Sequence, residues 1–148
     1  MSQSIDEFKA QYPFTTEIKV YWNDLDSNQH VNNVVYYRYL EQLRVEFLHA
    51  AFFDESQVKL GFVLAESSCR YLSSVNYPDT LLLGLYIAHI GDSQNIQHHG
   101  IYSYQQQRLV ATGTSRLVNV DSETGKKKPM ADGLKEALQR YFRSEQQD

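Results

Sequence analysis

The sequence has a single cysteine and no hydrophobic run long enough to cross a membrane. Cys69 cannot form a disulfide within the chain, and no paired thiols stand near it as in a zinc site. The longest apolar candidate, Leu81 to Ile90, is broken by Gly84 and His89 and falls short of the ~20 residues that span a bilayer. We therefore expect a protein of a reducing compartment, without a membrane span.

An excess of basic residues and an N-terminal targeting signal are also missing. Fourteen Lys and Arg residues stand against eighteen Asp and Glu, giving a formal net charge of -4, and the basic residues are scattered. This distribution argues against nucleic acid as a partner. The segment Met1 to Glu7 has no basic stretch followed by an apolar one, as a secretory signal would. The cytoplasm is the expected location.

Length and composition suit one domain with a hydrophobic core. The chain has 148 residues, which is too short for two ordinary domains, and 42% of them are hydrophobic. We expect a single domain over residues 1–148.

Hydrophobic periodicity predicts a strand followed by a long helix. Ile18, Val20 and Trp22 alternate with Lys19, Tyr21 and Asn23. This period-two pattern is typical of a half-buried strand. From Val34 onward the period changes to that of a helix, whose apolar stripe is Tyr36, Leu40, Leu43, Phe47 and Ala50, flanked by Tyr39 and Ala51.

After Gly61 the pattern predicts four consecutive strands and a last helix. The four strand ranges are Phe62 to Val75, Leu81 to Ile90, Asn95 to Gln105 and Leu109 to Asp121. The tail predicts a helix with Pro129 in its first turn and an apolar face of Leu134, Ala137, Leu138, Tyr141 and Phe142.

This order indicates an α+β fold in which an antiparallel sheet packs on one long helix. One helix covers only one face of a five-stranded sheet. The remaining surface would carry apolar and aromatic residues, which we interpret as a sign of a homo-oligomer: Tyr21, Leu82, Tyr86, Tyr102 and Tyr104.

The loop before the long helix concentrates the side chains that could do chemistry. Asp24, Asp26 and His30 precede Asn32 or Asn33, either of which could cap the helix. Amides of the first helical turn lack intrahelical acceptors and can polarise a carbonyl oxygen, while a nearby carboxylate attacks the carbonyl carbon or activates water. The alternative interpretation is a loop in which Asp and Asn only stabilise turns and His30 holds the loop.

Glu41 and the two adjacent histidines are not expected to take part in the chemistry of this loop. Glu41 lies more than two helical turns beyond the loop and is interpreted as structural. His98 and His99 are adjacent on a predicted strand, so they point to opposite faces and cannot bind one metal together. We expect neither a metal nor another cofactor.

Several segments resemble the 4-hydroxybenzoyl-CoA thioesterase-like branch of the hot-dog superfamily. The resemblance covers most of the chain and lies in Asp24-Leu25-Asp26, His30-Val31-Asn32-Asn33, Tyr36-Tyr37-Arg38-Tyr39-Leu40-Glu41, Arg70-Tyr71-Leu72, Tyr77-Pro78-Asp79, Ala111-Thr112-Gly113, Val120-Asp121 and Lys128-Pro129.

The resemblance implies a hot-dog fold, a long helix wrapped by a five-stranded antiparallel sheet with a C-terminal helix. It also implies dimers with a continuous sheet, often paired into tetramers, and active sites at the dimer interface. The expected activity is hydrolysis of a fatty or aromatic acyl-CoA thioester. Asp26 would be the base or nucleophile, the backbone amide of Asn33 would polarise the carbonyl, and His30 would have a supporting role.

Other activities stay open at this point. A hot-dog hydratase or dehydratase is one alternative, although its Asp and His are spaced one residue further apart than Asp26 and His30. A non-catalytic acyl-binding protein is the second. An acyl carrier protein thioester is a less attractive substrate than acyl-CoA, because both proteins would be acidic.

Overall fold

The computed structural model describes residues 2–52 and 61–144, which form one five-stranded antiparallel sheet and three α-helices. The strands lie in the order β1-β3-β4-β5-β2. The elements in chain order are α1 (Ile5–Gln11), β1 (Phe14–Lys19), the short 3-10 helix η1 (Trp22–Asp24), α2 (Asn33–Ala51), β2 (Phe62–Tyr71), β3 (Thr80–Ile90), β4 (Gln94–Ser103), β5 (Arg108–Asn119) and α3 (Asp132–Gln139).

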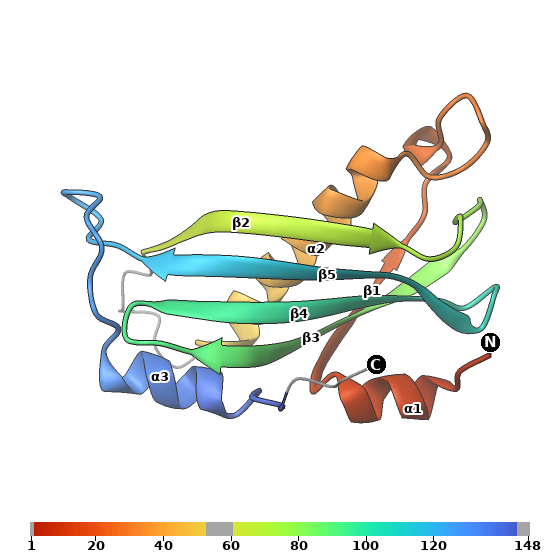
Figure 1. The fold of residues 1–148 in the computed structure, drawn as a ribbon. Coiled ribbons are helices and arrows are strands. Elements are labelled where there is room, and N and C mark those ends of the chain that lie inside the picture. The colour runs from red at the N-terminus through yellow and green to blue at the C-terminus, as the bar shows by residue number, and fades with distance from the viewer. Residues whose placement is uncertain (1, 53–60, 145–148) are drawn as a thin grey trace.

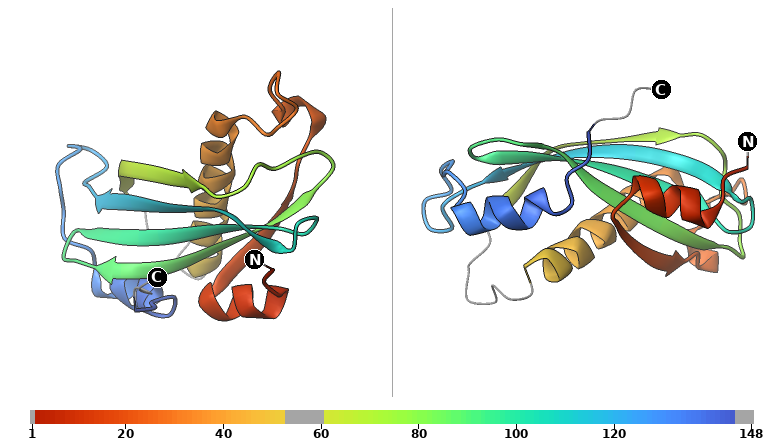
Figure 2. Two further views of the ribbon diagram at one scale, coloured as in Figure 1. Left: turned by 45° about the vertical axis from the view of Figure 1, so that its right-hand side comes forward. Right: turned by 90° about the horizontal axis from the view of Figure 1, so that it is seen from below.

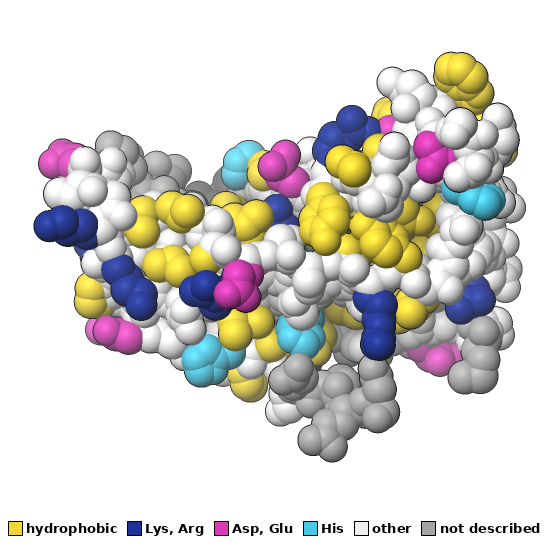
Figure 3. Space-filling view, turned by 45° about the horizontal axis from the view of Figure 1, so that its top comes forward, with side chains coloured by type: hydrophobic (Ala, Val, Ile, Leu, Met, Phe, Trp, Pro, Cys, Tyr) yellow, Lys and Arg dark blue, Asp and Glu magenta, His cyan; other side chains and the backbone are white. Residues whose placement is uncertain are grey.

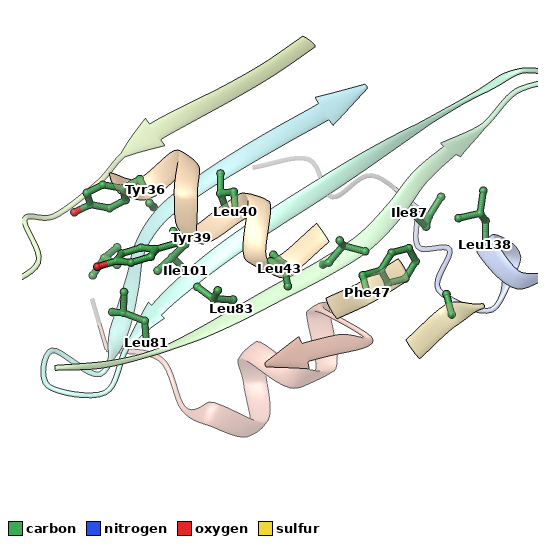
Figure 4. Packing of buried hydrophobic residues seen from close by; sticks show 14 of the residues in the cluster. Tyr36, Tyr39, Leu40, Leu43, Phe47, Leu81, Leu83, Ile87, Ile101 and Leu138 are labelled. Carbon is green, nitrogen blue, oxygen red and sulfur yellow. The ribbon is translucent and has the colours of Figure 1, made fainter. Parts of the chain in front are cut away.

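The long helix α2 lies against one face of the sheet and runs obliquely to the strands (Figures 1 and 2). Its buried residues pack on the side chains of β3 and β4 that point to the same face, and α3 closes one end (Figure 4). The core side chains of this layer include Tyr36, Tyr39, Leu40, Leu43, Phe47, Leu81, Leu83, Leu85, Ile87, Ile101 and Leu138. The predicted α+β hot-dog arrangement is confirmed.

The apolar stripe of α2 differs from the prediction near its end. Ala50 is exposed, whereas Ala51 is buried, because the position one turn after buried Phe47 is four residues on. Arg44, which the hydrophobic pattern does not include, is 9% exposed.

A helix that the sequence analysis did not predict, α1, covers part of the other face of the sheet. The Ser4 hydroxyl caps it by accepting a 3.1 Å hydrogen bond from the Glu7 amide. Phe8 and Tyr12 are buried in a second core with three side chains of β3 and β4: Leu82, Tyr86 and Tyr102. The interpretation of those three residues as free surface for an oligomer was therefore wrong, because a segment of the same chain covers them.

The first strand and the last helix also depart from their predicted limits. β1 ends at Lys19, and Trp22 starts η1 instead of continuing the strand, because the Asp24 carboxylate accepts a 3.0 Å hydrogen bond from the Tyr21 amide and turns the chain. Pro129 precedes α3, which begins at Asp132.

The chain after α3 runs beside β3. The Ile87 amide donates to the Tyr141 oxygen, and the Arg143 amide donates to the Ile87 oxygen. This pairing takes Tyr141 and Phe142 out of the predicted helix. β2 and β4 end earlier than predicted, at Tyr71 and Ser103. Within residues 2–52 and 61–144, no helix combines the length and apolar character needed to cross a bilayer.

Candidate active site

Of the two acidic residues in the loop before α2, Asp24 is structural. Its side chain is 2% exposed and accepts hydrogen bonds from the Tyr21 amide, from Arg38 Nη2 at 2.5 Å and from the Tyr39 hydroxyl at 2.8 Å. Burial, followed by this bond to Asp24, raises the pKa of Tyr39. Asp24 thus fastens the loop to α2 and has no oxygen left for a substrate.

Asp26 is half-buried and sits in a tight turn. Its Oδ1 accepts a 2.8 Å hydrogen bond from the Asn28 amide, and its backbone amide donates to the His30 oxygen, also at 2.8 Å. Gln29 has a φ of 64°, in the left-handed region. The turn-forming role considered from the sequence is therefore real, yet within the described part of the chain no donor contacts the second carboxylate oxygen of Asp26.

The start of α2 leaves one amide without an acceptor. Asn32 is the N-cap, and its Oδ1 accepts a 3.0 Å hydrogen bond from the Val34 amide. The neighbouring amides of Val31, Asn32 and Val35 donate to backbone oxygens. For the Asn33 amide, no acceptor is found among residues 2–52 and 61–144. This N–H lies at the positive end of a 19-residue helix.

One hollow brings together the three residues singled out from the sequence. Asp26, His30 and Asn33 line a space of about 330 Å³, together with Val31, Tyr36, Tyr71, Leu72, Ser73 and Ser74. The last four come from the end of β2 and the segment after it. The Val31 amide donates to the Val75 oxygen at 2.9 Å, which ties this segment to the loop.

Tyr71 forms the wall opposite the loop. Its hydroxyl donates a 2.9 Å hydrogen bond to the Asn33 carbonyl oxygen, and its ring meets Tyr36 edge-on, with the ring centres 4.9 Å apart. Desolvation, with smaller effects of Cys69 and Tyr37, raises the pKa of Tyr71 to about 12, so the hydroxyl keeps its proton at neutral pH. Hydrophobic patterning predicted Tyr71 to lie on a strand, and nothing in that pattern indicated its place in the site.

A larger hollow, about 490 Å³, lies elsewhere and is less suited to catalysis. It is lined by residues that include Tyr21, Tyr77 and Asp79. Asp79 is the only carboxylate in this lining, and its two oxygens accept hydrogen bonds from the Ser103 hydroxyl and the Gln105 amide. Both carboxylate oxygens of Asp79 therefore have a donor, whereas one oxygen of Asp26 has none among the described residues.

The two adjacent histidines point to opposite faces, as their positions on a strand predicted. His98 packs on Tyr86, whereas His99 is 1% exposed and its Nε2 shares a 3.0 Å hydrogen bond with Ser115, which also accepts from Arg44. Across the described residues, no group of three or more His, Cys, Asp or Glu side chains is arranged to hold a metal ion.

β2 is an edge strand, and many apolar residues near it are exposed. Among the strands of the described residues, it pairs only with β5. Figure 3 shows hydrophobic side chains gathered on this side of the molecule, over β2 and α2. The exposed large hydrophobic residues of these two elements and the turn after β2 are Val34, Tyr37, Val45, Val63, Leu64, Tyr71 and Leu72.

A sheet around one long helix, with a carboxylate loop at the start of that helix, defines a protein of the hot-dog class. Residues 20–138 match the model of the thioesterase-like superfamily. The chain belongs to this family.

Solved structures agree with that assignment. The PA5185 protein of Pseudomonas aeruginosa strain PAO1 is 26% identical with a TM-score of 0.82, over 93% of this chain and 97% of that one. The PA2801 protein of the same species is 31% identical with a TM-score of 0.75, over 84% and 96%. A thioesterase from Thermus thermophilus, complexed with coenzyme A and zinc, is 24% identical with a TM-score of 0.74, over 86% and 98%.

Proposed function

We propose that the protein is an acyl-CoA thioesterase that hydrolyses the thioester of a fatty or aromatic acyl-CoA. One observation carries the proposal: Asp26 and the Asn33 amide, which has no acceptor among the described residues, line the same hollow. A carbonyl placed in this hollow would have an electrophilic donor on one side and a carboxylate on the other.

The reaction needs few groups. The Asn33 N–H stabilises the negative charge that grows on the thioester oxygen in the transition state. Asp26 either removes a proton from the attacking water or attacks the carbonyl carbon itself, giving an anhydride that water then opens. In both cases the carbon–sulfur bond breaks, coenzyme A leaves as a thiol, and the acyl group leaves as a carboxylic acid. His30 supports the turn through its backbone oxygen.

The substrate class is supported by the family and by the relative from Thermus thermophilus, which was crystallised with coenzyme A. The hollow alone does not enclose an acyl group, because Tyr71 and Leu72 on its rim are 44% and 43% exposed. We therefore expect a second copy of the chain to complete it.

The proposed assembly is a homodimer in which the β2 edges of two copies pair, with dimers able to associate into homotetramers. The free backbone groups of an edge strand can pair with another strand. The exposed apolar residues of β2 and α2 would be buried by the same contact.

The decisive experiment measures thiol release from short, long and aromatic acyl-CoAs by the parent, by Asp26→Asn and by the surface variant Asp92→Asn. We expect hydrolysis by the parent and by Asp92→Asn, and a loss of at least about 100-fold in Asp26→Asn. Asp92 is a suitable control because it is an exposed acid, paired with Lys135, outside the hollow.

Other outcomes would point to other activities. Full activity of Asp26→Asn would remove this residue from the mechanism. Hydration of crotonyl-CoA without thiol release would favour a hot-dog hydratase, and acyl-CoA binding without turnover would favour an acyl-binding protein.

A further inference from the structure

The face of the sheet that points away from α2 carries two rows of side chains that run across four strands. In the first row Ser68, Thr114, His98 and Tyr86 stand directly opposite one another on β2, β5, β4 and β3. In the second row Arg70, Thr112, Gly100 and Gly84 are aligned in the same way. Residues directly opposite each other share a face, and so do residues two apart on one strand.

The end of α1 limits these rows on one side. The Tyr12 ring lies so close to Gly84 and Gly100 that a Cβ at either glycine would come within 2.6 Å of it. What remains between Tyr12, Gln11 and the polar residues of the rows is a hollow of about 320 Å³. It is separate from the candidate active site, which is lined by the neighbouring residue Tyr71 on the opposite face.

The described side chains that line this hollow are cationic or neutral. They include Arg70, His98 and several hydroxyl groups, and none of these described lining residues is Asp or Glu. The Arg70 side chain is exposed, and no carboxylate among residues 2–52 and 61–144 forms an ion pair with it. By contrast, Arg116 on the same face pairs with Glu66 at 3.1 Å.

The hydroxyl groups add donors beside this cation. Ser68 Oγ and Thr114 Oγ1 are 2.6 Å apart, and one of them donates to the other. The accepting hydroxyl keeps its own hydrogen for a ligand. Thr112, directly opposite Arg70, contributes a further hydroxyl. A guanidinium with neighbouring O–H donors in a concave site is the arrangement that recognises tetrahedral oxyanions.

We propose that this hollow binds a phosphate group, with Arg70 as the charged donor and with hydroxyl donors from Thr112 and from whichever of Ser68 and Thr114 accepts the bond between them. The phosphate can come from free inorganic phosphate or from the phosphorylated nucleotide end of a coenzyme A ester. The site does not depend on thioester hydrolysis, so binding can be tested without an active enzyme.

The test is a calorimetric titration of the full chain with inorganic phosphate and with adenosine 3′,5′-bisphosphate, which carries the 3′-phosphate and the first 5′-phosphate of the coenzyme A nucleotide. The variants are Arg70→Gln, Thr112→Val and the matched control Arg116→Gln. Arg116 lies on the same face but does not line the hollow. Thermal melting of each variant checks that it is folded.

We expect saturable binding by the parent, weakened at least about tenfold in Arg70→Gln, weakened less in Thr112→Val and unchanged in Arg116→Gln. Tighter binding of the bisphosphate than of phosphate, with the same dependence on Arg70, would identify a nucleotide end as the ligand, whereas equal binding of the two would identify free phosphate. Absence of saturable binding, or equal binding by Arg70→Gln and the parent, would overturn the proposal.

Discussion

The Tyr71 hydroxyl, at the end of β2, donates a 2.9 Å hydrogen bond to the carbonyl oxygen of Asn33, the first residue of α2. The two residues are 38 positions apart in the chain. This bond fixes the edge strand to the helix end whose first amide, which has no acceptor among the described residues, we propose to polarise the substrate carbonyl. Tyr71 is thus a positioning residue for the proposed reaction.

Replacing Tyr71 by Phe should lower kcat with little change in KM. The ring can keep its edge-on contact with Tyr36, while the loss of one hydrogen bond of about 1 kcal/mol would reduce the rate about fivefold. Steady-state kinetics with the best acyl-CoA measure this, with Tyr77→Phe, which lies outside the hollow, as the control. A rise in KM at constant kcat would instead assign Tyr71 to substrate binding.

Substitution of the two acidic residues of the loop should have different effects, one on stability and the other on activity. Asp24→Asn removes the charge from a buried carboxylate that accepts from Arg38 and Tyr39, and should lower the free energy of unfolding by about 2 kcal/mol. Asp26→Asn can still accept from the Asn28 amide and should change stability by less than about 0.5 kcal/mol while abolishing most activity.

Urea unfolding and thiol release, measured on both variants, test this division. A large loss of stability in Asp26→Asn would show that the turn, and not catalysis, is the main role of this residue. Equal stability of Asp24→Asn and the parent would contradict the structural role of Asp24.

The contact between Tyr12 and Gly100 should behave as a steric pair. Gly100→Ala would place a methyl group against the Tyr12 ring and should cost about 1–3 kcal/mol of stability. In the double variant with Tyr12→Ala, the added methyl has space, so its own cost should nearly vanish. A double-mutant cycle by urea unfolding checks this, and additive losses would mean that α1 does not rest on Gly100 in solution.

His99 should make stability depend on pH in the weakly acidic range. Its pKa falls from the ordinary 6.5 to about 3, mainly because the imidazole is buried and secondarily because Arg44 and His98 repel its charge. Between about pH 6.5 and pH 3, the unfolded chain binds a proton here that the folded protein does not, so this contribution is full above pH 6.5 and decreases as pH falls.

The measurement compares urea midpoints at pH 7.5 and pH 5 for the parent, for His99→Gln and for the exposed control His89→Gln. We expect the urea midpoint of His99→Gln to differ less between the two pH values than the midpoint of the parent does. The midpoint of His89→Gln should differ by as much as that of the parent. The same pH dependence in His99→Gln and the parent would contradict this account.

The parts of the molecule that the sequence predicted correctly depend on local patterns. The stripe of α2 from Tyr36 to Phe47 follows from helical periodicity. Its position predicted a cap at Asn32 or Asn33, and Asn32 is the cap in the structure. The loop of the candidate site could be recognised because its residues are contiguous. Phe8 and Tyr12, four residues apart after the Ser4 cap, carried a signal for α1 that the sequence analysis did not use.

The parts that it missed depend on contacts between distant segments. Leu82, Tyr86 and Tyr102 could not be distinguished from an interaction surface without knowing that α1 folds back over them. Tyr71, Ser73 and Ser74 reach the candidate site only because β2, at the edge of the sheet, ends beside the start of α2. Hydrophobic periodicity carries no information about such tertiary contacts.

β3 is buried on both faces, with Leu83 and Leu85 toward α2 and Leu82 and Tyr86 toward α1. In most strands a slip of one residue is prevented because it would bring polar side chains into the core. Here both faces are apolar, so hydrophobicity alone discriminates poorly between the native alignment and a shifted one. Gly84 supplies the missing specificity, since Tyr12 leaves room only for a residue without a side chain, and a shift in either direction would place a leucine there. The alignment of β3 is therefore set by shape at a single position.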